Sequence, residues 1–174
     1  TLPPGVFQGL GQLQSLDLSL NDFTTLPAGV FQGLDHLQSL DLSGNRLITL
    51  SVGTFQGLNN LLSLKLSDNW KLSTLPAEIF LDLISLQVLA LSNNAFNTTL
   101  PVKLFQSLHH LQSLDLSGNT LPLLSREIFQ DLGQLQFLNL KKIDLTALPV
   151  GLFHGLHRVQ SLDLSIDAFT TFPA

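Results

Sequence analysis

Residues 37–45 read Leu37-Gln38-Ser39-Leu40-Asp41-Leu42-Ser43-Gly44-Asn45, and nearly the same string recurs along the whole chain. The pattern L-x-x-L-x-L-x-x-N begins at Leu13, Leu37, Leu61, Leu86 and Leu111, and weaker copies begin at Leu135 and Val159. A second motif, Phe with Leu three residues later, stays in phase with the first at steps of 24 or 25 residues. Two motifs in phase over seven copies indicate a repeat protein built from units of 24 or 25 residues.

The spacing also predicts the shape of each repeat. In Leu-x-Leu the two leucines face one side of a short strand, which can bury them only if neighbouring repeats stack about 4.8 Å away. The return segment at residues 26–34 begins Leu-Pro and holds Gly29 and Gly33, which favours short turns over a long helix. We therefore predict an α/β repeat solenoid: a leucine-rich repeat right-handed superhelix with a concave parallel β-sheet and a convex side of short 3-10 or α turns.

We expect one leucine-rich repeat domain over residues 1–174, with about seven repeats, partial repeats at both ends and no Cys caps. Two side-chain columns are expected to hold it together. The first is a Phe spine of Phe7, Phe31, Phe55, Phe80, Phe105, Phe129 and Phe153. The second is a structural Asn ladder of Asn21, Asn45, Asn69, Asn94 and Asn119, whose amides can satisfy turn backbone groups. Ile143 and Asp167 interrupt this ladder.

Composition excludes several classes of function. The net charge is −5 with only 8 Lys and Arg, which argues against nucleic acid as a partner. No apolar run is long enough to cross a membrane, so we expect no membrane span in this chain. The N-terminus has neither the basic nor the apolar region of a signal peptide, although a mature protein would have lost one.

No catalytic or cofactor motif is present, so we expect neither an enzyme nor a cofactor. Asp17 and Asp41 should be outward neighbours, but nothing adds further oxygen ligands, and a solvated acidic stripe is the simpler interpretation. His154 and His157 are three residues apart, which is too few ligands for zinc. We predict no metal site.

Outward-facing positions carry the candidate binding surface. Most repeats show a monotonous Q-S-L-D-L-S there, and the departures cluster in two places. Variation on a constant scaffold is either a recognition surface or neutral drift on a solvated face. Trp70 lies at a one-residue insertion and is either a binding anchor or a side chain packed over the core. The predicted concave-face ligand-binding residues are Lys65, Asp68, Trp70, Val88, Ala90, Asn93, Phe137, Asn139, Lys141 and Lys142.

Asn97-Thr98-Thr99 forms an N-glycosylation sequon in a predicted surface loop, which makes Asn97 a candidate glycosylation site in a secreted protein. Uncapped repeat ends would expose leucines such as Leu2 and Leu10, so we also expect unseen caps or end-to-end association into a homo-oligomer.

The sequence resembles the typical class of extracellular animal leucine-rich repeats, and most closely the variable lymphocyte receptors and similar chordate receptors. The resemblance lies in L-P-x-G-V-F at residues 2–7 and 26–31, with a related string at residues 148–153. It implies an extracellular, secreted or cell-surface protein that recognises protein or microbial carbohydrate ligands on its concave sheet, as in immune receptors. Two alternatives stay open: a structural or adhesive matrix protein that dimerises, and an ectodomain segment of a signalling receptor.

Overall fold

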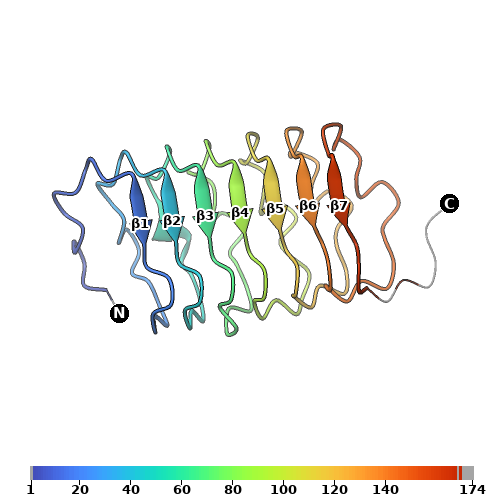
Figure 1. Ribbon diagram of the computed structural model, residues 1–174, viewed down its shortest axis with the longest axis horizontal. Coiled ribbons are helices and arrows are strands. Elements are labelled where there is room, and N and C mark those ends of the chain that lie inside the picture. The colour runs from blue at the N-terminus through green and yellow to red at the C-terminus, as the bar shows by residue number, and fades with distance from the viewer. Residues whose placement is uncertain (1, 168, 170–174) are drawn as a thin grey trace.

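The computed structural model describes residues 2–167 and 169 and forms one parallel sheet of seven three-residue strands. The strands lie side by side in chain order from β1 to β7 (Figure 1). Their bounds are β1 Ser15–Asp17, β2 Ser39–Asp41, β3 Ser63–Lys65, β4 Val88–Ala90, β5 Ser113–Asp115, β6 Phe137–Asn139 and β7 Ser161–Asp163. Thr1 and Ala174, at the predicted partial repeats, lie outside the described residues. The predicted leucine-rich repeat solenoid is confirmed.

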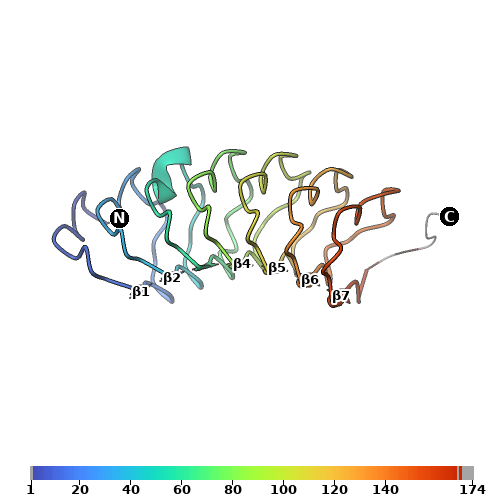
Figure 2. The same ribbon diagram turned by 90° about the horizontal axis from the view of Figure 1, so that it is seen from above.

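Each strand pairs with the next in strict register, so that equivalent residues of successive repeats form straight rows across the sheet. The central Leu16 pairs with Leu40, and Leu40 pairs with Leu64. Viewed from above, the strands follow the inner side of an arch and the return segments follow its outer side (Figure 2). The arch follows because the return segments are bulkier than the strands, so stacking leaves the sheet on the concave face.

The convex turns have 3-10 character. Their backbone bonds join residues three apart, as in Val30 N–H to Pro27 C=O at 3.3 Å and Leu104 N–H to Pro101 C=O at 2.9 Å. A regular 3-10 helix forms only at η1, Val52–Phe55, and residues 2–167 contain no α-helix. Of the two expected turn types, only the 3-10 type occurs in this part of the chain.

A column of stacked Phe rings lies beneath the convex turns. Phe7, Phe31, Phe55, Phe80, Phe105 and Phe129 stack in succession with ring centroids 6.0 to 6.5 Å apart. Those from Phe31 to Phe129 are fully buried, whereas Phe153 is only partly buried against the core. The inward leucines of the strands cover the other side of this column, so one continuous apolar core runs along the solenoid.

The Asn side chains bridge successive repeats through backbone groups. The Asn69 amide donates to the carbonyls of Leu42 at 3.1 Å and Leu66 at 3.0 Å, and its oxygen accepts the Leu47 N–H at 3.2 Å. Asn45 and Asn119 likewise donate to a carbonyl of the preceding repeat, whereas Asn94 bridges the repeats through its oxygen, which accepts the Asn69 N–H at 2.9 Å. These three are buried, and Asn21 in the first repeat is exposed. Each buried Asn thereby satisfies turn groups that would otherwise lie unpaired in the core.

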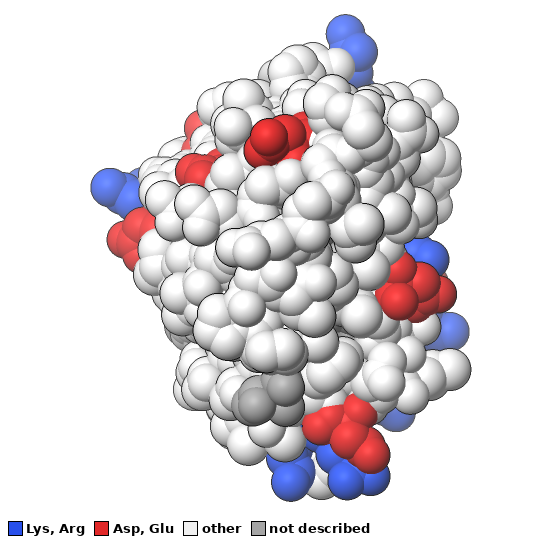
Figure 3. Space-filling view, turned by 90° about the vertical axis from the view of Figure 1, so that its left-hand side faces the viewer, with Lys and Arg blue, Asp and Glu red and all other residues white. Residues whose placement is uncertain are grey.

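The two ends of the solenoid leave apolar side chains partly uncovered. Figure 3 views the N-terminal end, where the centre carries no charged group and the Asp, Glu, Lys and Arg residues lie around its rim. Leu10 is 47% exposed near this end, and Leu162 on β7 is 40% exposed near the other. In the described part of the chain, no helix has both the length and the apolar character that crossing a bilayer requires.

Candidate functional site

The ten predicted binding residues divide between the sheet and the loops that follow it. The residues on strands are Lys65, Val88, Ala90, Phe137 and Asn139, all at outward positions. The others follow the strands: Asp68, Trp70, Asn93, Lys141 and Lys142. Trp70 comes five residues after the end of β3, in the loop at the one-residue insertion, so it does not lie on a strand.

The sheet carries an apolar area at its middle, the central concave patch, which consists of Val88, Ala90, Ser113, Phe137 and Asn139. Val88, Ser113 and Phe137 form one row across β4, β5 and β6. Val88 is 38% exposed and Phe137 48% exposed, although both project from strands whose central leucines are buried. Two large apolar side chains thus stand in solvent about two strand spacings apart, with only a serine between them.

Charged groups flank this patch on both sides. On the N-terminal side, Lys65 Nζ lies 3.2 Å from Asp41 Oδ2. On the C-terminal side, the exposed Lys141 follows β6, and Asp163 lies on β7. Asp115 on β5 adds a carboxylate inside the patch, between Ala90 and Asn139. The face therefore combines two exposed apolar side chains with charged groups of both signs, a layout that suits a protein-binding surface.

The outward Asp residues are held by the backbone that follows them. Asp17, Asp41, Asp115 and Asp163 each accept the N–H of the Ser two residues later at 2.8 to 2.9 Å. Bonds from the hydroxyl and the N–H of Ser19 lower the pKa of the Asp17 carboxyl, and Ser165 lowers the pKa of Asp163 in the same way. These two carboxyls therefore carry negative charge throughout the neutral range.

The loop residues form a second row, along the edge where the strands end. Asp68, Asn93 and Lys142 have positive φ angles of 59°, 53° and 55°. Gly44 and Gly118 occupy the same turn position in their repeats, with φ angles of 66° and 67°. The Asn93 amide donates to Asp68 Oδ1 at 3.0 Å, and Lys71 Nζ lies 4.6 Å from the Trp70 ring centroid. Trp70 is 60% exposed, so it is available for contact beside the sheet.

Two other sequence features fall on the surface. Asn97, Thr98 and Thr99 are all exposed in an irregular segment, so an oligosaccharide transferase could reach the sequon. Among the described residues, no three His, Asp or Glu side chains gather in a way that could hold a metal ion. His36 instead contacts the Gly11 carbonyl through Nδ1 at 2.9 Å, which gives it a structural partner.

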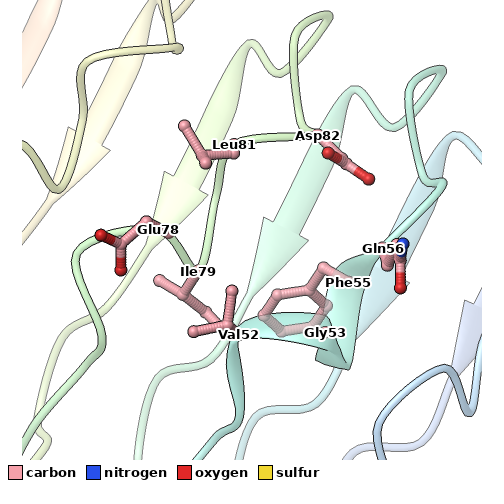
Figure 4. A pocket seen from close by; sticks show the side chains of 8 residues that line it. All are labelled: Val52, Gly53, Phe55, Gln56, Glu78, Ile79, Leu81 and Asp82. Carbon is pink, nitrogen blue, oxygen red and sulfur yellow. The ribbon is translucent and has the colours of Figure 1, made fainter.

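A hollow on the convex side was not predicted from the sequence. It has a volume of about 320 Å3 and lies between η1 and the next convex turn, where Glu78 and Asp82 flank it (Figure 4). Glu78 and Asp82 replace the glycines found at the same positions of the preceding repeat, Gly53 and Gly57. The replacement of these two glycines by two acidic residues is the sequence feature from which the hollow could have been predicted.

Three overlapping stretches of the chain, residues 1–47, 36–96 and 85–142, match the family described as Leucine rich repeat. No curated protein sequence gives a significant match. The chain is similar to the solved structure of TLR13 in its complex with ssRNA13, with a TM-score of 0.92 and 35% identity over 97% of this chain and 24% of that one.

Two further solved structures are similar along nearly the whole chain. A Leptospira interrogans leucine-rich repeat protein has a TM-score of 0.85 and 38% identity, over 99% of this chain and 42% of its own. A chain of the Drosophila Toll–Spatzle complex has a TM-score of 0.79 and 26% identity, over 99% of this chain and 26% of its own. The chain therefore spans less than half the length of each of these three proteins.

Proposed function

Because the chain belongs to the leucine-rich repeat family and is a non-enzymatic scaffold like the proteins it resembles, we propose that it is an extracellular recognition module that binds a protein ligand on its concave sheet. The ligand rests on the central concave patch, with Val88 and Phe137 as its apolar anchors. Lys65, Asn139 and Lys141 supply polar contacts around them. Asp68, Trp70, Asn93 and Lys142 extend the surface onto the adjoining edge.

The observation that carries this proposal is the distribution of sequence change on the strands. β1, β2, β5 and β7 all read Ser-Leu-Asp, whereas β3, β4 and β6 read Ser-Leu-Lys, Val-Leu-Ala and Phe-Leu-Asn. The central Leu is the same in every strand, so the changes affect only the outward positions. Stability of the fold gives no reason to place Val88 and Phe137 in solvent, whereas burial against a ligand does.

The chemistry of the face favours protein over RNA, the ligand named for TLR13. Asp17, Asp41, Asp115 and Asp163 face outward on the strands against a single strand lysine, Lys65. RNA binding needs clustered cations along a groove, with aromatic side chains beside them for stacking of the bases. A rigid sheet with an apolar centre instead suits a folded protein partner, because little conformational entropy is lost on binding.

The test is a binding screen of the purified chain against arrays of secreted proteins, microbial glycans and lipopolysaccharides, and single-stranded RNA. For any ligand found, the V88S/F137S double variant should bind at least about tenfold more weakly. V150S is the matched control, because Val150 is 72% exposed on a convex turn away from the sheet. A ligand whose affinity is the same for V88S/F137S and the unaltered chain would overturn the concave site, and binding of RNA alone would overturn the choice of partner.

The immune-type assignment rests on the variable lymphocyte receptor-like motif and on the similarity to proteins of the Toll–Spatzle and TLR13 complexes. The alternative function, an ectodomain segment of a signalling receptor, would bind its ligand on the same surface. N-glycosylation of Asn97 belongs to this proposal of an extracellular location. Mass spectrometry of protein secreted from a eukaryotic host should find a glycan on the peptide that contains Asn97, which the N97Q variant lacks. An unmodified Asn97 in the secreted chain would remove that support.

A further inference from the structure

The convex hollow is bounded by two successive turns. Val52 and Phe55 line it from η1, and Glu78, Ile79, Leu81 and Asp82 line it from the following turn. In Figure 4 the carboxylates of Glu78 and Asp82 stand on opposite sides of the apolar side chains of Val52 and Ile79. η1 lies on the outer side of the arch, away from the strands (Figure 2). The hollow is therefore a separate place from the central concave patch.

Glycine positions explain why the hollow forms between these two turns. Gly53 and Gly57 lack side chains, and an added Cβ would meet nothing closer than 3.5 Å at Gly53 and nothing within 4 Å at Gly57. One repeat later, 25 residues along the chain, the same positions hold Glu78 and Asp82. The first turn leaves open space and the second lines that space with carboxylates. In the first two repeats the same positions are all glycine, Gly5, Gly9, Gly29 and Gly33, so no acid lines them.

The lining combines apolar walls with two carboxylates that form no ion pair with the described residues. Val52 is 51% exposed and Leu81 41% exposed, and the buried Ile79 and Phe55 lie beneath them. Asp82 Oδ2 accepts the Gly57 N–H at 2.8 Å, which fixes the carboxylate at the rim. Within residues 2–167, the ion pairs are Arg46–Asp22, Lys65–Asp41 and Arg126–Glu127, so neither Glu78 nor Asp82 has a cationic partner there.

We propose that this hollow receives a basic side chain, lysine or arginine, from a partner protein. Such a side chain has an aliphatic stem that covers Val52 and Leu81 and a cationic end that pairs with one of the two carboxylates at the rim. Nucleic acid and anionic membranes would be repelled by the same two acids. A divalent cation lacks a third acidic or histidine ligand among the described residues. The proposal is independent of the concave site, and both faces can be occupied together.

The sixth convex turn provides an internal comparison. Glu127 and Asp131 stand at the positions of Glu78 and Asp82, two repeats further along. There the chain supplies its own cation, because Arg126 Nε lies 2.7 Å from Glu127 Oε1 and Ser125 also donates to Glu127. The glutamate of the sixth turn is thus already paired with a cation, whereas Glu78 forms no ion pair with the described residues.

The test is an NMR titration of the 15N-labelled chain with N-acetyl-arginine amide, with the neutral N-acetyl-citrulline amide as the control probe. Saturable shifts should concentrate on the amides of Gly53, Gln56, Gly57, Leu81 and Asp82 and should weaken as salt is added. The E78Q/D82N variant should bind the arginine probe about five- to tenfold more weakly. Its folding should be intact, because the amide introduced by D82N keeps an oxygen that can accept the Gly57 N–H.

The matched variant E127Q/D131N removes the same charge from the sixth turn and should leave the titration unchanged. Equal shifts with the citrulline probe would overturn the proposal. So would arginine-induced shifts that follow the strand aspartates rather than the hollow, or an affinity that E78Q/D82N does not alter. None of these results depends on finding the concave ligand.

Discussion

Asp167 Oδ1 accepts the backbone N–H of Ile143 at 2.9 Å, and so joins the last two repeats at the position where an Asn joins the others. It also accepts the Leu145 N–H at 3.3 Å. Ile143 has no polar side chain, and the Leu121 N–H donates to its backbone carbonyl instead, at 2.7 Å. Asp167 thus supplies the acceptor of an Asn but not its donor, and its Oδ2 is buried without a partner among the described residues.

The D167N variant should be more stable than the unaltered chain by about 1 kcal/mol near pH 7, because an amide can donate where Oδ2 has no partner. Burial is the main cause that raises the pKa of Asp167 above its ordinary value of 3.8. A raised pKa stabilises the fold fully below that ordinary value, and the contribution is lost as the pH rises through the folded-state pKa. The gain from D167N should therefore shrink in acid.

Urea unfolding at several pH values, with hydrogen exchange of the Ile143 and Leu145 amides, measures this gain. D163N is the control, because Asp163 is accessible and its pKa is lowered rather than raised. A D167N variant less stable than the unaltered chain at neutral pH would show that the carboxylate is satisfied in a way the geometry does not reveal.

Replacement of Phe80 by Ala should cost about 3–5 kcal/mol of unfolding free energy, because it opens a cavity in the middle of the Phe column. The Phe80 ring is fully buried and stacks on Phe55 at 6.3 Å and Phe105 at 6.5 Å. F137A is the matched control, since that ring is 48% exposed and should cost little. An unfolding midpoint in urea that is the same for F80A and the unaltered chain would refute the structural role of the column.

Replacement of Asn69 by Ala should cost about 3 kcal/mol, because it leaves the Leu42 and Leu66 carbonyls and the Leu47 N–H without their partner in the interior. The N21A variant makes the matched comparison. Asn21 is exposed and its amide donates to the carbonyls of Leu18 and Ser19 in its own turn, so water can replace it. Equal losses for N69A and N21A in chemical denaturation would contradict a role for burial.

The fold follows from the sequence because its periodicity acts on every repeat in the same way. Leu40 and Leu64 must face one side of the sheet for either to be buried, and the 24-residue step then aligns them. The Phe column is predicted by the same argument, since one ring per repeat at a constant place has to stack on the next. These inferences depend on the spacing of the repeats alone and need no information about the conformation of any loop.

The candidate sites were harder to infer because they depend on departures from the repeat. Trp70 lies at the one-residue insertion, in the loop that follows β3, and the repeat pattern does not determine how a lengthened loop places its side chains. The hollow beside Glu78 is the space between two adjacent convex turns. It exists because Gly53 and Gly57 have no side chains to fill that space when the turns stack. Sequence spacing predicts which residues are neighbours, not the volume between them.

Trp70 is the only tryptophan in the chain, so its fluorescence reports directly on the edge beside the sheet. Because the ring is 60% exposed, we expect ready quenching by acrylamide in the free chain, although Lys71 lies over the ring. A ligand that covers both the central concave patch and the edge should protect Trp70 several-fold, and W70A should then weaken binding together with F137A. The opposite outcome has two parts: F137A abolishes ligand binding, and Trp70 in the complex of the unaltered chain is still fully quenched by acrylamide. In that case the binding surface is confined to the strands, and the edge residues lie outside it.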